Sequence, residues 1–144
     1  MARYRTTVPS RRPIEEAFDY MADFSHARDW DPSVTSARRI GEGAIGLGTT
    51  FELVTTFNGR AMPLTYEVTA YDPPRRVALR AQTPLVISFD EITFESSGDD
   101  TDVTYEATLR TRGWLRLASP VISLMFKGIG DRARAGLARE LNPQ

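Results

Sequence analysis

From Val34 to Thr111 the chain alternates apolar and polar residues with a period of two. Such alternation is typical of β-strands that have one face in a core and one face in water. Short connections rich in Gly, Pro, Asn and Asp separate the alternating segments, which predicts hairpins in an antiparallel sheet. Residues 2–9 alternate in the same way and predict a further strand. The clearest of the central segments are 51–57, 64–70, 77–81 and 103–109.

Two short segments between these strands follow a helical period instead. Residues 13–22 place apolar side chains on one face, which predicts a helix directly after the first strand. Asp23 is suited to cap a second short helix that continues to Trp30, and Pro32 prevents that helix from extending further.

The longest helical pattern runs from Gly113 to Asn142. Its apolar residues cover an arc of roughly 200°, wider than one flat contact surface needs. Pro120 lies inside this segment and predicts a kink, because proline removes one helical hydrogen bond. The helix therefore requires a partner that wraps around it. The central stripe consists of Trp114, Leu117, Ala118, Val121, Met125 and Ile129.

The predicted order is one strand, two short helices, six strands and one long helix. This order indicates an α+β fold in which a curved seven-stranded antiparallel sheet wraps around the long C-terminal helix, with a cavity between them. The length of 144 residues and the apolar content of 41% fit a single domain over residues 1–144.

Composition narrows the classes of function. The net charge of −1 argues against nucleic acid or an anionic membrane surface as the main partner. No apolar run is long enough to span a bilayer, so we expect no integral membrane association. The absence of Cys removes thiolate chemistry and is compatible with a cytoplasmic location, which we expect here because the N-terminus lacks the apolar core of a signal peptide. With a single histidine, the sequence predicts no metal site and no cofactor.

Gly41 to Gly46 match the G-x-G-x-x-G pattern of dinucleotide-binding proteins. That pattern binds phosphates only between a strand and the N-terminus of a helix, and here a strand follows. We therefore interpret the segment as a connection between two strands.

Candidate catalytic groups are few. In the strand around Asp90 and Glu91 the alternation slips, which predicts a β-bulge at residues 88–91 and leaves open which carboxylate faces inward. A carboxylate facing the cavity would have a raised pKa and could act as an acid or a base, whereas a solvated one would pair with arginine. His26, the only histidine, is either a surface residue or a proton carrier at the cavity mouth.

Large apolar and aromatic residues on inward positions are the candidates for contact with a ligand. Each of them could equally serve only the core, and the two tyrosines could donate one hydrogen bond each. The candidates are Trp30, Phe51, Tyr66, Phe89, Tyr105, Trp114, Val121 and Met125.

Three stretches of the chain carry a resemblance to a known family. The run from Phe18 to Val34 contains Trp-Asp-Pro at 30–32, residues 48–51 read Gly-Thr-Thr-Phe, and residues 66–75 read YEVTAYDPPR. These features resemble the START-like (SRPBCC) superfamily with its helix-grip, birch-pollen-allergen-like fold, and within it the bacterial polyketide cyclase/dehydrase and lipid-transport group. The resemblance covers essentially the whole chain. We expect a cavity that opens near Trp30 and the loop 41–48.

The resemblance leaves three functions open. The first is binding of a small hydrophobic or aromatic molecule, such as a lipid, a quinone or a polyketide. The second is a cyclase or dehydratase that uses acid and base groups in the cavity, which requires at least two titratable groups to converge there. The third is an interaction module with a collapsed cavity, which could form a homodimer through an exposed apolar edge.

Overall fold

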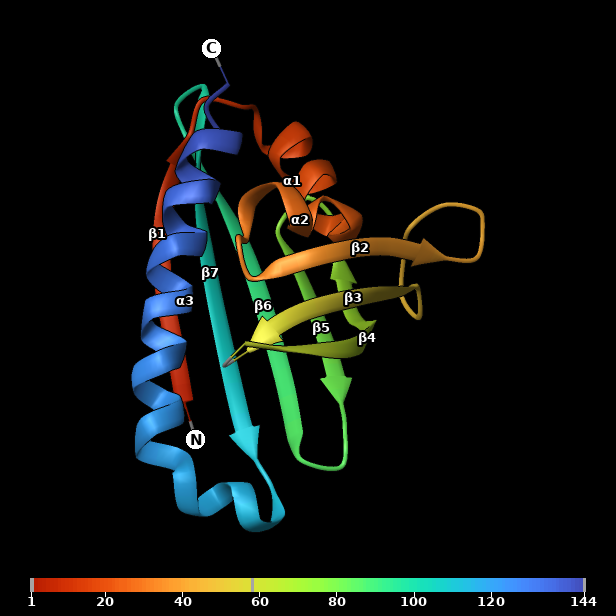
Figure 1. The fold of residues 1–144 in the computed structure, drawn as a ribbon. Coiled ribbons are helices and arrows are strands. Elements are labelled where there is room, and N and C mark those ends of the chain that lie inside the picture. Colours follow the sequence, from red (N-terminus) through yellow and green to blue (C-terminus); the bar gives the residue numbers. More distant parts are fainter. Residues whose placement is uncertain (1, 58, 144) are drawn as a thin grey trace.

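Seven strands form one curved antiparallel sheet in the computed structural model, which describes residues 2–57 and 59–143 apart from the side chains of Phe57, Trp114, Ala118 and Ser119 (Figure 1). The strand order is β1-β7-β6-β5-β4-β3-β2, so the first strand pairs with the last one. Ala2 lies opposite Leu109, and Ser10 lies opposite Thr101. The strands are β1 (Ala2–Ser10), β2 (Val34–Ile40), β3 (Thr50–Phe57), β4 (Arg60–Asp72), β5 (Arg76–Gln82), β6 (Val86–Ser97) and β7 (Asp100–Thr111).

The helices follow the predicted order with one difference at the C-terminal end. The Asp23 side chain accepts a hydrogen bond from the Ser25 amide at 3.1 Å, which confirms the predicted cap. The helices are α1 (Ile14–Ala22), the 3₁₀ helix η1 (Phe24–His26), α2 (Ala27–Trp30), the 3₁₀ helix η2 (Gly113–Ala118) and α3 (Ser119–Glu140). This architecture is the helix-grip fold that the sequence predicted.

The prediction of a β-bulge in β6 is wrong. The register of β6 is continuous with both neighbouring strands. Thr93 of β6 lies opposite Arg76 of β5, and Val86 of β6 lies opposite Thr111 of β7. The even-numbered residues of β6 face inward along most of its length, and the odd-numbered residues face outward. The apparent slip arose because apolar residues occupy both faces of this strand.

The predicted single helix from Gly113 is also wrong, since α3 begins only at Ser119. Pro120 therefore lies in the first turn, where a missing amide proton costs no helical hydrogen bond, and no kink at this proline is needed. The buried side of α3 is not the predicted central stripe either. Ile122 and Leu137 are buried, whereas Leu117 in η2 and Val121 are exposed.

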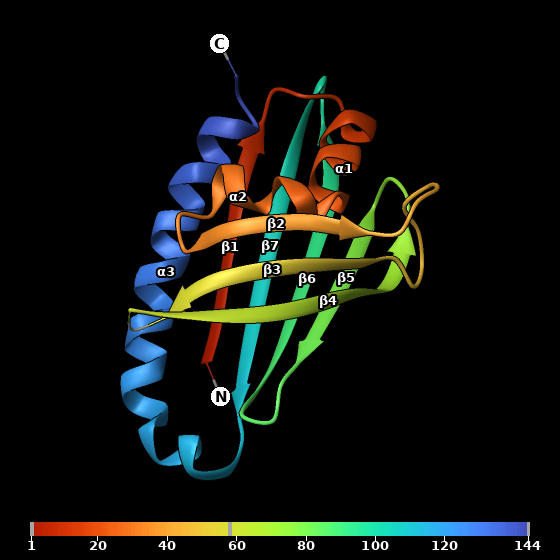
Figure 2. The ribbon, with the colours of Figure 1, turned by 45° about the vertical axis from the view of Figure 1, so that its right-hand side comes forward.

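Helix α3 lies along β1 at one edge of the sheet and beside α2 (Figures 1 and 2). Two glycines allow this close approach. A Cβ atom on Gly136 would lie 1.9 Å from the carbonyl oxygen of Trp30, and a Cβ atom on Gly130 would lie 2.5 Å from the ring of Tyr4. The Tyr4 hydroxyl also donates to Asp131 Oδ1 at 2.8 Å, which ties β1 to α3.

An aromatic cluster holds η1 and α2 against the inner face of the sheet. The ring of Phe24 lies 5.2 Å from that of Tyr66, and the ring of Trp30 lies 5.3 Å from that of Tyr105, both with edge-to-face geometry. Such pairs add about 0.5–1.5 kcal/mol each beyond the burial of their area. The short helices therefore cover one end of the sheet and leave the space under α3 partly open.

We predict that Gly136→Ala lowers the free energy of unfolding by about 1–3 kcal/mol, because the new methyl group forces α2 and α3 apart. Gly128→Ala is the matched control on the same helix. Its Cβ atom would meet only the Arg132 side chain at 3.7 Å, so the better helix propensity of alanine should raise stability by up to about 1 kcal/mol. Urea unfolding followed by circular dichroism measures both changes. Equal stability of the two variants would contradict the close α2–α3 contact.

Candidate functional site

A cavity of about 110 Å³ lies between the inner face of the sheet and α3. Its wall is mostly apolar. Thr56 and Ile129 border this cavity and also a wider surface groove of about 380 Å³ between α3 and the turn that joins β3 to β4. The cavity therefore opens between β3 and α3. Its apolar wall includes Met62, Leu64, Ala107, Leu109, Phe126 and Leu137.

This position corrects the predicted opening. Trp30 lines the cavity but is only 3% exposed, and no residue of the loop 41–48 contributes to the wall. The loop leaves the sheet at the far ends of β2 and β3, away from α3 (Figure 2). The sequence could not show this, because the opening depends on where α3 passes the sheet.

A chain of polar side chains interrupts the apolar wall. The Tyr105 hydroxyl donates to Asp90 Oδ2, and Ser88 Oγ donates to Asp90 Oδ1 at 3.3 Å. The Tyr66 hydroxyl lies 2.9 Å from Ser88 Oγ. Because Ser88 gives its proton to Asp90, the serine oxygen is free to accept the proton of Tyr66. All four side chains are buried.

The sheet register explains how these side chains meet. Ser88 and Asp90 are two residues apart on β6 and therefore share one face. Tyr66 on β4 lies opposite Ala81 on β5, which lies in turn opposite Ser88. Since the alanine side chain is small, the Tyr66 hydroxyl can pass over β5 and reach the serine.

Burial dominates the electrostatics of this chain. It raises the pKa of Asp90 from 3.8 to about 6, although the hydrogen bonds from Tyr105 and Ser88 act in the opposite direction. Burial, followed by the nearby charge of Asp90, raises the pKa values of Tyr66 and Tyr105 well above their ordinary value. Near neutral pH the two tyrosine hydroxyls are therefore protonated and can donate hydrogen bonds, and Asp90 can be either protonated or ionised.

A second carboxyl group, Asp31, also lines the cavity. It follows α2 directly and accepts hydrogen bonds from the Ser33 amide at 2.9 Å and from Ser33 Oγ at 2.8 Å. Burial raises its pKa, and the same two hydrogen bonds and the charge of Arg132 oppose that shift. Sequence reasoning missed Asp31 and Ser88 as site residues. The Asp-Pro-Ser run was a usable signal for a carboxylate held in a turn, and the even numbering of Ser88 matched that of Asp90.

Three of the predicted ligand contacts, Trp30, Tyr66 and Tyr105, line the cavity. Phe51 is completely buried but is not part of the wall, because it packs beneath Phe24 with ring centres 6.3 Å apart. The side chain of Trp114 lies outside the described residues.

The remaining three predicted contacts are not in the cavity wall. Phe89 is on the outer face of β6, where the guanidinium of Arg80 lies 5.6 Å from its ring centre, so its inward assignment is wrong. Val121 is 62% exposed, because the start of α3 extends past the inner face of the sheet. Met125 lines the outer groove instead.

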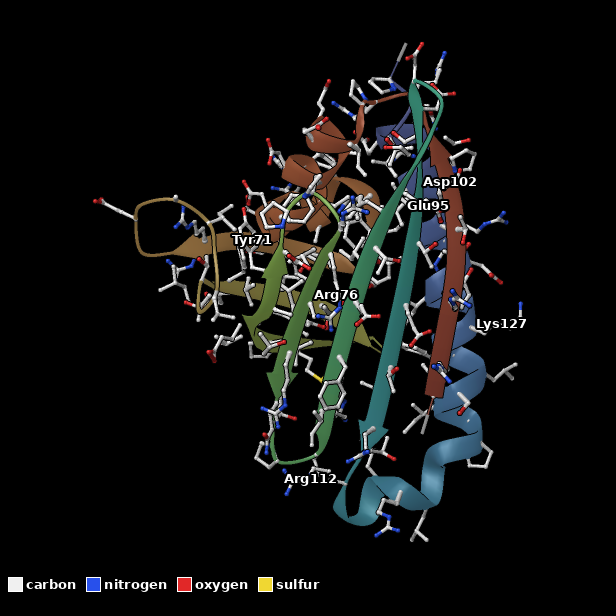
Figure 3. The ribbon with its side chains drawn as sticks, turned by 180° about the vertical axis from the view of Figure 1, so that it is seen from behind. Tyr71, Arg76, Glu95, Asp102, Arg112 and Lys127 are labelled. Atoms are coloured by element: carbon white, nitrogen blue, oxygen red, sulfur yellow. The ribbon has the colours of Figure 1, made fainter. Side chains whose placement is uncertain are left out.

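Of the three candidate catalytic residues, one lines the cavity and two do not. Asp90 faces the cavity, whereas Glu91 faces outward and pairs with Arg76 at 2.8 Å (Arg76 is labelled in Figure 3). His26 is not part of the wall. Its Nδ1 atom lies 2.9 Å from the Tyr20 carbonyl oxygen, and its ring stacks on Tyr20, so His26 does not border the cavity as a proton carrier there would have to.

Within residues 2–57 and 59–143, no group of three or more potential metal-ligating side chains comes together. In the same part of the chain, no helix combines the length and the apolar character that a membrane crossing requires.

Comparisons with known proteins agree with this architecture. Solved structures similar to this chain include a START superfamily protein from Mycobacterium smegmatis, with a TM-score of 0.80, 12% identity, and coverage of 98% of this chain and 97% of that one. The Zhui aromatase/cyclase from Streptomyces sp. R1128 has a TM-score of 0.74, 17% identity, and coverage of 96% and 90%. The major latex-like protein 151 from Panax ginseng has a TM-score of 0.68, 9% identity, and coverage of 99% and 98%.

At these identities the likeness concerns the fold alone. No curated protein sequence matches the chain. The sequence does match, over residues 1–142, the family described as polyketide cyclase / dehydrase and lipid transport. This match shows that the chain belongs to the polyketide cyclase / dehydrase and lipid transport family, and the helix-grip fold and the cavity under α3 agree with it.

Proposed function

We propose that this protein binds a small, mostly hydrophobic molecule that carries a hydroxyl group. The observation behind this proposal is the buried carboxyl group of Asp90 inside an otherwise apolar cavity. A carboxylate offers about four acceptor positions, and Asp90 uses two of them for Tyr105 and Ser88. The others favour a ligand that donates a hydrogen bond, such as a phenol or an enol.

The size of the cavity supports one ring or one end of a longer molecule. An apolar cavity of about 150 Å³ is known to hold benzene, and the cavity here is about 110 Å³. The rest of a larger ligand would extend past Thr56 and Ile129 into the outer groove. A lipid, a quinol and an aromatic polyketide all fit this description. An open cavity of this kind does not support the interaction module with a collapsed interior.

We expect 2-naphthol to bind about tenfold more tightly than naphthalene at pH 8, because only the phenol donates to the charged Asp90. Asp90→Asn should remove most of this difference. Glu91→Gln is the matched control, since that neighbouring carboxylate faces outward. Fluorescence titration gives the dissociation constants. If Asp90→Asn and Glu91→Gln bind both probes equally well, Asp90 is not a binding group.

The raised pKa of Asp90 also predicts a pH dependence of stability. The folded protein holds this proton more tightly than the unfolded chain does, so the contribution of Asp90 to stability is full below pH 3.8 and is lost as the pH rises through about 6. Asp90→Asn, which resembles the protonated form, should therefore be more stable than the natural protein at pH 8 by up to about 3 kcal/mol.

Urea unfolding of both proteins between pH 4 and pH 8 measures this difference. It should shrink as the pH falls and vanish near pH 4. A constant difference across the range would show that Asp90 does not titrate as proposed.

A second candidate function is catalysis of a cyclase or dehydratase type. A carboxyl group with a pKa of about 6 that is hydrogen-bonded to a tyrosine can exchange protons with a ligand near neutral pH. Asp90 could remove a proton from the carbon next to a ketone carbonyl and later return it to a hydroxyl group that leaves as water. The two carboxyl groups and two tyrosines in the wall meet the requirement for converging titratable groups.

Acetophenone in deuterated water tests this second function without knowledge of the natural substrate. If Asp90 acts as a base, the protein accelerates deuterium exchange at the methyl group, with a rate that rises as the pH passes through about 6. Asp90→Asn should reduce the rate at least about a hundredfold, while Glu91→Gln retains it. Proton NMR follows the exchange. Phenol binding without any acceleration would leave the binding function and eliminate the enzymatic one.

A further inference from the structure

Exposed aliphatic side chains gather where η2 leads into α3. Leu117 is 89% exposed, Leu124 is 74% exposed and Val121 is 62% exposed. Val121 and Leu124 are three residues apart on α3 and therefore lie on one side of it, and Leu117 precedes them in η2. Water-exposed aliphatic residues are ordinary when single, but a contiguous group marks a contact surface.

The same end of the molecule is basic. Arg110 near the end of β7, Arg112 after it and Arg116 in η2 are all exposed, and the sequence contains no acidic residue from Ala107 to Gly130. Figure 3 shows Arg112 at the end of the sheet, next to η2. Since the whole chain has a net charge of −1, its charge is unevenly distributed. The net charge of the whole chain therefore differs in sign from the local charge at this end of the molecule.

We name this end of the molecule the α3 tip and define it by six exposed residues. Arg110 is on the outer face of β7, because it follows the cavity-lining Leu109, and the other five residues come after β7 in the chain: Arg112, Arg116, Leu117, Val121 and Leu124. In Figures 1 and 2 the η2–α3 corner lies past the end of β7 and away from α1 and α2. Other parts of the described chain thus leave it free to approach a large surface.

We propose that the α3 tip docks on the surface of a lipid bilayer that contains anionic lipids. The aliphatic side chains would enter the boundary between headgroups and acyl chains, and the arginines would lie among the negatively charged headgroups. Surface docking of this kind needs no membrane-spanning helix. It requires apolar and basic residues together, and the α3 tip combines them.

A second copy of this chain fits the α3 tip less well. A symmetric dimer places the same patch of both copies face to face, so three arginines would meet three arginines. No carboxylate from residues 107–130 is present to compensate these charges. A bilayer supplies negative charge and a deformable apolar layer, and it needs no matching shape for a convex corner.

Sedimentation with lipid vesicles tests the proposal on the full chain. We expect at least about tenfold tighter binding to vesicles of phosphatidylglycerol and phosphatidylcholine than to pure phosphatidylcholine, with weaker binding in high salt. The variant Leu117→Ser/Val121→Ser/Leu124→Ser and the variant Arg110→Gln/Arg112→Gln/Arg116→Gln should each lose at least about tenfold in affinity.

Two matched controls separate this site from general stickiness or charge. Leu47→Ser removes another exposed leucine, from the loop at the far ends of β2 and β3, and Arg28→Gln/Arg60→Gln/Arg75→Gln removes the same charge from other exposed positions. Both should bind like the natural protein. Equal losses in the control and α3-tip variants, or no preference for anionic vesicles, would overturn the proposal. So would a dimer in analytical ultracentrifugation that the leucine variant converts to a monomer, because the α3 tip would then contact a second copy.

Discussion

The close contact of α3 with β1 and α2 determines the rest of the structure. Gly130 and Gly136 let the helix backbone approach a tyrosine ring and a backbone carbonyl at distances that no larger residue permits. Because the helix is held at this edge, it does not press on the middle of the sheet. Protein interiors are otherwise closely packed, so a cavity persists only where backbone positions are fixed by stronger contacts elsewhere. The cavity under α3 therefore depends on the tight packing of α3 against β1 and α2.

The polar groups in that space work against stability. A core that only had to be stable would hold apolar side chains at positions 88 and 90, since a buried carboxyl group is costly even with good hydrogen bonds. The alanine opposite Ser88 and the small Ala107 opposite Asp90 leave room for the tyrosine hydroxyls to reach them. A departure from simple core packing that involves residues on three strands is typical of a functional site.

Much of the fold could be predicted because its signals are local. Alternation placed Tyr66 and Tyr105 inward, and Asp23 marked the start of a short helix. The predictions were wrong in elements whose apolar residues occupy more than the buried face. In β6, Ile87 and Phe89 are apolar but face outward, with Arg80 over the phenylalanine ring, so alternation alone could not choose the inner face. In α3 the apolar arc is wider than the contact with β1, and only the tertiary structure decides which part is buried. Pro32 marks the end of α2 locally, but Asp31 enters the wall because that end lies over the cavity, which only the tertiary structure decides.

The pairing of β1 with β7 has a consequence for the order of folding. Hairpins such as β3–β4 and β6–β7 pair segments that are close in the chain. In contrast, Ala2 in β1 pairs with Leu109 in β7, which is far from it in the chain. Closing such a long loop is entropically expensive, and folds rich in distant contacts form slowly. On a ribosome, the first strand to be synthesised waits until the last strand has emerged. During that interval β1 has no partner strand, and a neighbouring unfinished chain can pair with it in place of β7.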